Sequence, residues 1–167
     1  VFLNGLFFNP TKGSLSLEGV LEAIAEYMQE KPASIYELVV GCDSSPSEEP
    51  YFPVVVVVLR KGEGGRYFLQ RVHYDNRKFV HLHERILQEV YLSCQLALYL
   101  RENFGAYMKE KHPDISYQFE YVHADIGENG PTRDMIKEVT GLIRGNGFEP
   151  RIKPYSFAAS TVADRYS

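Results

Sequence analysis

The chain has 167 residues, which is the length of one ordinary domain. Hydrophobic residues make up 44% and charged residues 24% of it, and this composition excludes a disordered, collagen-like or low-complexity protein. The formal net charge of −4 excludes a general positive field that would attract nucleic acid, so such binding would need a local basic cluster. We therefore predict a single domain over residues 1–167.

The start of the chain and its cysteines favour a cytoplasmic location. Residues 1–8 are apolar but lack the basic segment and the small-residue cleavage site of a signal peptide. No apolar run reaches the roughly 18 residues of a membrane span. Cys42 and Cys94 are too few for a disulfide framework or a four-cysteine zinc site, and they suit a reducing compartment.

A helix and a three-stranded meander are predicted in the first half of the chain. In order, these are a helix over about residues 15–30 and strands over 36–42, 51–60 and 66–74. Ser14 or Ser16 can cap the helix, and Pro32 ends it. Five consecutive valines in the second strand predict burial on both faces of the sheet. The charges of the third strand predict a sheet edge.

Helices and strands alternate in the second half. They are a helix over about 82–103, a strand over 115–124, a helix over 132–144, a strand over 148–153 and a final helix over 156–166. Gly105 is expected to end the first of these helices. The order predicts an α/β fold with a five-stranded mixed sheet, made of a meander followed by parallel strands and flanked by helices.

Two aspartates come directly after predicted strands. Asp43 follows the first strand and Asp125 follows the fourth. If these strands are parallel neighbours, both carboxylates lie at the edge of the sheet where functional groups collect. Like charges placed together repel unless a divalent cation such as Mg²⁺ or Mn²⁺ bridges them. The alternative for either aspartate alone is a structural cap in a turn.

Two helical acids can complete such a site. Glu89 borders the apolar face of its helix, where an unpaired charge is costly, whereas Glu84 lies on a polar stripe and is kept in reserve. Asp164 lies in a small-residue stretch of the final helix, and its alternative is a solvated acid near the chain end. His123 shares a strand face with Asp125, either as a proton carrier or as a packed, hydrogen-bonded histidine.

Basic residues gather on the second and third strands, with aromatic residues between them. Arginines pair with phosphates and aromatic rings stack on bases, so this hairpin can follow a polynucleotide backbone. A solvated edge strand is the alternative. Including a second patch near the C-terminus, the predicted nucleic-acid-binding residues are Arg60, Lys61, Arg66, Arg71, Lys153 and Arg165.

Several separated motifs resemble the YkuK-like family of bacterial proteins. They are the segments Phe8-Asn9-Pro10-Thr11-Lys12-Gly13, Gly41-Cys42-Asp43-Ser44, His123-Ala124-Asp125-Ile126-Gly127 and Ala158-Ala159-Ser160-Thr161-Val162-Ala163-Asp164-Arg165. The resemblance spans nearly the whole chain and implies a ribonuclease H-like fold. That is the scaffold of ribonuclease H, Holliday-junction resolvases and transposases.

The leading hypothesis is a divalent-metal-dependent nuclease that cleaves DNA or RNA by a two-metal mechanism. Asp43, Glu89, Asp125 and Asp164 would hold Mg²⁺ or Mn²⁺. The alternative is a non-catalytic module that binds nucleic acid or a protein partner, because a fold does not fix a function. A junction-cutting enzyme would also need a homodimer.

Overall fold

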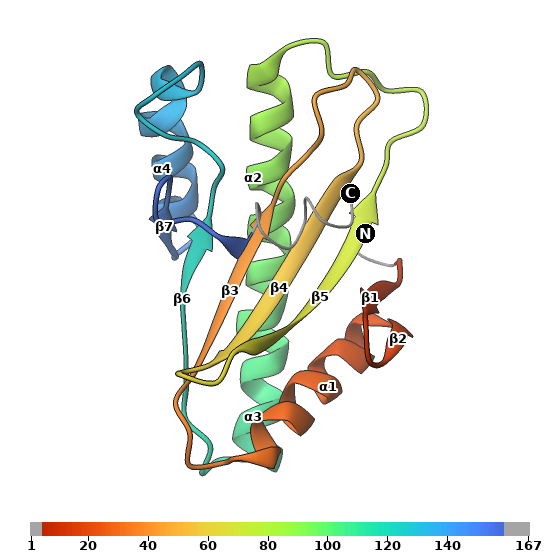
Figure 1. Cartoon of the computed structure of the whole chain (residues 1–167), viewed down its shortest axis with the longest axis vertical. Helices are drawn as coiled ribbons and strands as arrows, with labels where there is room; N and C mark the ends of the chain where they lie inside the picture. The colour runs from red at the N-terminus through yellow and green to blue at the C-terminus, as the bar shows by residue number, and fades with distance from the viewer. Residues whose placement is uncertain (1–4, 159–167) are drawn as a thin grey trace.

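A seven-stranded mixed sheet organises the computed structural model, which describes residues 5–158 (Figure 1). Its strands are β1 (Phe7–Asn9), β2 (Gly13–Leu15), β3 (Tyr36–Cys42), β4 (Phe52–Arg60), β5 (Gly65–Val72), β6 (Tyr117–His123) and β7 (Glu149–Arg151), in the spatial order β2-β1-β5-β4-β3-β6-β7. The predicted α/β fold with a mixed sheet is confirmed, with two strands more than the expected five. Most of the predicted final helix, including Asp164 and Arg165, lies outside the described residues.

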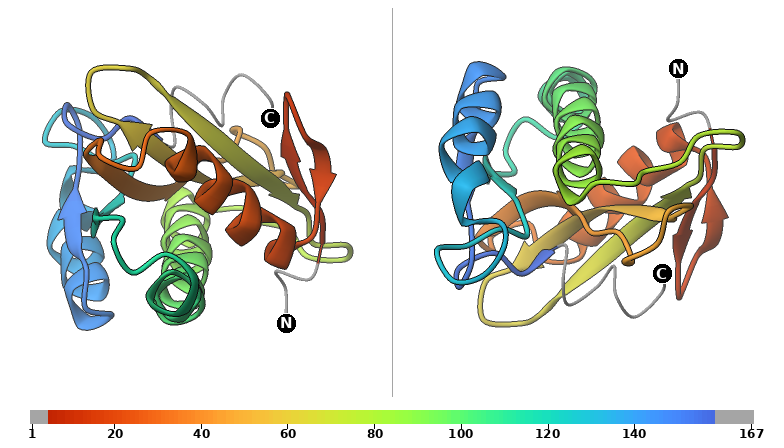
Figure 2. Two further views of the ribbon diagram at one scale, coloured as in Figure 1. Left: turned by 90° about the horizontal axis from the view of Figure 1, so that it is seen from below. Right: turned by 90° about the horizontal axis from the view of Figure 1, so that it is seen from above.

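The helices of the described chain pack on one side of the sheet (Figure 2). They are α1 (Leu17–Glu30), α2 (Leu82–Tyr99), α3 (Gly105–Lys111) and α4 (Ile136–Gly145), with a π-helical turn η2 (Leu100–Phe104) and a 3-10 turn η3 (Arg133–Met135). We call the side that they cover the first face. No helix within residues 5–158 combines the length and the apolar character needed to cross a bilayer.

The valine run of β4 is buried on both faces, as the sequence predicts. Val54, Val56 and Val58 belong to the main core beneath the helices. Val55 and Val57 point to the opposite side, which we call the second face, because side chains alternate along a strand. There they join a smaller buried cluster with Val39, Leu69 and Ala158.

An N-terminal hairpin supplies the two additional strands. The Asn9 side chain accepts hydrogen bonds from the backbone N–H groups of Thr11 (2.9 Å) and Lys12 (2.8 Å), and it donates to the Tyr67 carbonyl of β5 at 2.9 Å. Phe8 of β1 pairs with Leu69 of β5, so β5 lies inside the sheet. The prediction that the third strand of the meander is an edge is therefore wrong. Strands of three residues are too short to show a periodic pattern.

The long helix does not end before Gly105. That residue has helical backbone angles, φ −58° and ψ −47°. The buried side chains of Leu100, Phe104 and Met108 continue the apolar face through η2 into α3. A glycine inside a helix costs about 1 kcal/mol relative to alanine, which the burial of these large side chains exceeds. The predicted end at residue 103 is corrected to Lys111.

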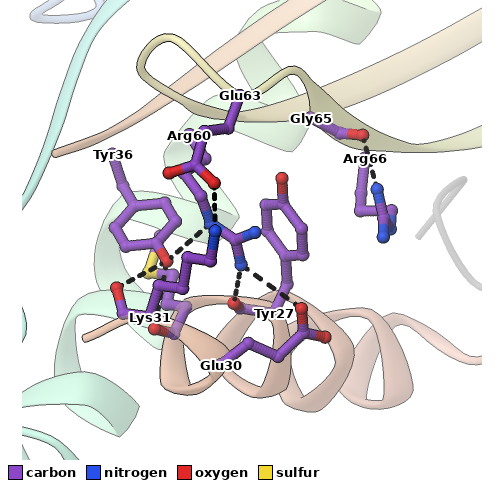
Figure 3. A network of polar contacts seen from close by, with 9 residues as sticks. Tyr27, Glu30, Lys31, Tyr36, Arg60, Glu63, Gly65 and Arg66 are labelled. Atoms are coloured by element: carbon purple, nitrogen blue, oxygen red, sulfur yellow. Dashed lines mark hydrogen bonds and ion pairs between the residues drawn. The ribbon is translucent and has the colours of Figure 1, made fainter. Parts of the chain in front are cut away.

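Arg60 holds the end of α1 on the sheet (Figure 3). Its side chain is 7% exposed. Nη2 donates to the Tyr27 carbonyl at 2.7 Å and contacts Glu30 at 3.3 Å, while Nε donates to the Tyr36 hydroxyl at 3.0 Å. The guanidinium also lies 4.0 Å from the centre of the Tyr27 ring. The Nε and Nη2 donors of Arg60, which is predicted from the sequence to bind nucleic acid, are thus used within the fold.

Replacing Arg60 by alanine should lower the free energy of unfolding by about 2–4 kcal/mol, because it leaves the buried Tyr27 carbonyl and Tyr36 hydroxyl without their charged partner. Urea denaturation followed by circular dichroism measures the change. The neighbouring exposed variant Lys61→Ala is the control and should shift the free energy by less than about 0.5 kcal/mol. Equal stability of the Arg60 variant and the parent would contradict this structural role.

Candidate metal centre and nucleic-acid interface

Asp43 and Asp125 lie at the same end of the sheet. β3 and β6 are parallel neighbours, and Val40 of β3 pairs with Val122 of β6. Asp43 directly follows β3, and Asp125 lies two residues beyond β6. The predicted pairing of these strands is confirmed, and it carries both carboxylates to their shared carboxyl edge.

Glu89 reaches the end of β3 from the first face. It lies in α2, is 3% exposed, and its Oε2 accepts hydrogen bonds from the Ser44 backbone N–H at 2.9 Å and from the Ser44 hydroxyl. Glu84 is exposed on the same helix. The helical pattern therefore identified the acid that turns inward, and Ser44, one residue after Asp43, is its anchor.

Asp125 acts electrostatically on Glu89, and both Glu89 and Asp43 act on Cys42. Burial raises the pKa of Glu89 to about 8, the Ser44 hydrogen bonds oppose this rise, and the charge of Asp125 adds to it. Burial, followed by the charges of Glu89 and Asp43, raises the pKa of the Cys42 thiol well above its usual range. Cys42 therefore stays protonated and unreactive, and this end of the sheet favours added positive charge.

Lys153 brings a positive charge to Asp125. Its Nζ lies 3.1 Å from Oδ1 of Asp125. The backbone fixes this approach, because the Lys153 N–H donates to the Ile126 carbonyl at 2.8 Å. Gly127 permits it, since a Cβ there would stand only 3.0 Å from the Cβ of Lys153. A residue predicted to bind nucleic acid thus stands beside the acids.

His123 is packed rather than open to solvent. It is 1% exposed, and its Nδ1 accepts hydrogen bonds from the backbone N–H groups of Phe157 (3.1 Å) and Ala158 (3.2 Å). Burial, with a smaller contribution from Arg151, lowers the pKa of His123 to about 4. The ring is therefore neutral near pH 7 and ties residues 157–158 to β6. This arrangement matches the packed alternative considered from the sequence.

The other basic residues divide between the two ends of the sheet. Arg60 pairs with Tyr36 at the start of β3, and Lys61 and Arg66 lie near this end, which is about 20 Å from Asp43 at the rise of a strand. Arg71 pairs with Pro53 and lies toward the acidic end. The predicted hairpin residues therefore do not form one patch with the acids.

The donor set suits a hard divalent cation. Asp43, Glu89 and Asp125 offer carboxylate oxygens, the ligands that Mg²⁺ and Mn²⁺ take in proteins. Burial is the main cause of the raised pKa of Glu89, and the charge of Asp125 adds to it. Within residues 5–158, no group of three or more histidine, cysteine, aspartate or glutamate side chains is close enough to hold an ion. The fourth predicted ligand, Asp164, lies outside the described residues.

Residues 19–167 match the ribonuclease H-like family. The chain belongs to this family. It is 27% identical over 169 aligned residues to Uncharacterized protein YkuK of Bacillus subtilis (strain 168), an alignment that covers 97% of this chain and 96% of the relative. No solved structure gives a significant match. The resemblance carried by the sequence motifs is thereby confirmed, and the fold supports a nuclease-like or nucleic-acid-binding role.

Glu89 should make the metal-free protein less stable as pH rises from 6.5 to 8. Its pKa of about 8 in the folded state exceeds its usual value of about 4.3, so the folded state holds one more proton in between and unfolding becomes easier as pH rises. His123 has the opposite effect, but only between its pKa of about 4 and the usual 6.5. Between pH 6.5 and 8, the expected change in the free energy of unfolding therefore comes from Glu89 and not from His123.

Denaturant melts in chelator should show a loss of about 2 kcal/mol across this window. Glu89→Gln, which cannot ionise, should remove this slope. The matched variant Glu84→Gln, at an exposed position of the same helix, should keep it. An unchanged slope in Glu89→Gln would show that another group titrates.

Proposed function

We propose that this protein is a divalent-metal-dependent nuclease that hydrolyses phosphodiester bonds in DNA or RNA. The observation that supports it is the placement of Asp43, Glu89 and Asp125 at the same end of β3 and β6. Membership of the ribonuclease H-like family supports the same direction. The free, buried cysteines suit a reducing compartment, and we propose the cytoplasm as its location.

We assign Asp43, Glu89, Asp125 and Asp164 as ligands of Mg²⁺ or Mn²⁺. Both Ser44 hydrogen bonds go to Oε2 of Glu89, so Oε1 is the oxygen assigned to the cation. Two such cations, when bound, supply an acidified water and a positive charge for the leaving oxygen. The chain itself contributes position, since α2 and β3 hold the acids before any substrate arrives.

Lys153 has a separate part in this proposal. Its ammonium neutralises Asp125 in the resting protein and is 55% exposed at the side chain. With a phosphate present, the same ammonium would donate to a non-bridging oxygen, and Asp125 would be available to hold the cation. Ser44 acts through Glu89 and is therefore a positioning residue.

The second candidate is a non-catalytic module of the same fold that binds nucleic acid or a protein partner. The internal contacts favour it: Ser44 already binds Glu89, and Lys153 already pairs with Asp125. Such a module needs no divalent cation. Cleavage of a branched junction would in addition require a symmetric homodimer.

Asp43→Asn should abolish Mg²⁺-dependent cleavage and leave the metal-free protein as stable as the parent or slightly more so, because it deletes a ligand and relieves repulsion. Cleavage of single-stranded, duplex, hybrid and branched substrates, paired with thermal melts in chelator, measures both effects. Asp114→Asn is the matched control, because Asp114 is exposed and precedes β6, at the opposite end of that strand from Asp125. A structural cap would instead lose about 1 kcal/mol of stability. That loss, without chelator-sensitive cleavage by the parent, would favour the non-catalytic module.

Lys153→Gln should tighten Mn²⁺ binding several-fold, because it removes a competing positive charge 3.1 Å from Asp125. It should also slow cleavage through loss of the phosphate contact. Isothermal titration with Mn²⁺ gives the first result, and cleavage rates at saturating Mn²⁺ give the second. Lys61→Gln, at the far end of the sheet, serves as the control. Absence of Mn²⁺ binding in the parent would argue for the alternative.

A further inference from the structure

An aromatic pair lies on the second face at the acidic end of the sheet. Phe52 of β4 pairs with Val72 of β5, and both belong to the main core. Their outer neighbours Tyr51 and His73 therefore fall on the opposite side, the second face, by strand alternation. Neither aromatic residue was singled out from the sequence.

The pair is stacked and exposed. The ring centres of Tyr51 and His73 are 4.5 Å apart with an interplanar angle of 27°. Nδ1 of His73 donates to the Pro50 carbonyl at 3.2 Å, which fixes the ring orientation. Tyr51 is 49% exposed, and the guanidinium of Arg71 lies 5.9 Å from its ring centre. An ordered aromatic surface with an adjacent cation thus faces outward.

A hollow continues this surface toward the N-terminal hairpin. It has a volume of about 430 Å³ and is lined by Leu6, Phe8, Leu69 and Arg71. Leu6 is 62% exposed and Phe8 39% exposed, so its walls are apolar and accessible. Arg71 both lines the hollow and lies beside the ring of Tyr51. Apolar walls with one fixed cation suit a flat, partly polar ligand such as a nucleobase.

We propose that the Tyr51–His73 pair and the hollow beside it bind unpaired bases of a single-stranded polynucleotide. Every base has a π-face that stacks on an aromatic ring, and an arginine beside it pairs with the neighbouring phosphate. A base inside a duplex is already stacked on both sides and cannot offer that face. The inference deepens the proposed function and rests on it: it names single strands, or unpaired ends, as the substrate class.

The distance between the acids and the aromatic pair allows one polynucleotide strand to reach both. Cys42 at the end of β3 pairs with Val54 of β4, so Asp43 is level with Pro53, and Tyr51 lies two residues further on, just before the start of β4. At about 3.3 Å per residue, this puts Tyr51 roughly 7 Å beyond the level of Asp43. A few nucleotides therefore connect a phosphodiester at the acids with a base at Tyr51. The competing role of the pair is cross-strand stabilisation of the sheet end alone.

Fluorescence anisotropy with the full chain in chelator separates binding from cleavage. The probes are labelled oligothymidine, oligouridine and a mixed-sequence duplex, each of about 20 nucleotides or base pairs. Tyr51→Ala should weaken binding of the single strands about tenfold and change duplex binding less than about twofold. Tyr51→Phe should retain the affinity, whereas Tyr51→Leu should not restore it. Tyr91→Ala is the control, because Tyr91 is 51% exposed on α2.

Each outcome decides between the two proposals. Unchanged single-strand affinity in Tyr51→Ala and Tyr51→Leu would overturn this inference and leave the nuclease proposal standing. Tyr51-dependent binding by a parent that cleaves nothing in Mg²⁺ or Mn²⁺ would support the inference and overturn the nuclease proposal. Absence of binding to all three probes would overturn the inference. If Tyr51→Ala melts well below the parent, the comparison of the phenylalanine and leucine variants decides.

Discussion

The buried carboxylate of Glu89, held by Ser44, is the interaction on which the acidic end of the sheet depends. It joins α2 on the first face to the chain at the point where β3 ends, and so fixes the residue beside Asp43. Hydrogen bonds to a charged group are stronger than neutral ones, but a buried carboxylate also carries a desolvation cost. The raised pKa of Glu89 expresses this balance. The Glu89 side chain thus links α2 to the end of β3, and its raised pKa shows that its ionisation is unfavourable there.

Each end of the sheet buries an ionisable side chain, Arg60 at one end and Glu89 at the other. At the start of β3, Nε and Nη2 of the Arg60 guanidinium donate to a tyrosine hydroxyl, a helix-end carbonyl and Glu30. At the other end, Glu89 is held by the neutral donors of Ser44, and the charge of Asp125 opposes its ionisation. The first arrangement stabilises the attachment of α1. The second leaves an excess of negative charge, which is the physical basis for assigning function to that end.

At this end of the sheet, the second face is the side on which we place the bound polynucleotide. The Tyr51–His73 pair and Arg71 lie on it, while α1, α2, α3 and α4 cover the first face. Family membership supports a nuclease-like or nucleic-acid-binding role for this protein. A cation at the acids and a base at the aromatic pair would use adjoining parts of the same end of the sheet. The residues that hold the cation and the residues that bind the base would then lie at the ends of different strands of the same sheet.

Local periodicity in the sequence was sufficient for β3, the both-sided burial of β4, the start of α2 and the choice of Glu89 over Glu84, because each depends on neighbours within a few turns or strand positions. The ordered motifs likewise identified the family. Only the tertiary structure revealed the hairpin that covers β5, the helix that continues through Gly105, the internal partners of Arg60 and the stacking of Tyr51 on His73. These features depend on side chains far apart in the chain, and on strand register, which decides which of them meet. The sequence by itself therefore determined the family and most of the elements, whereas packing between distant segments decided the remaining elements and which polar residues are used within the fold and which face outward.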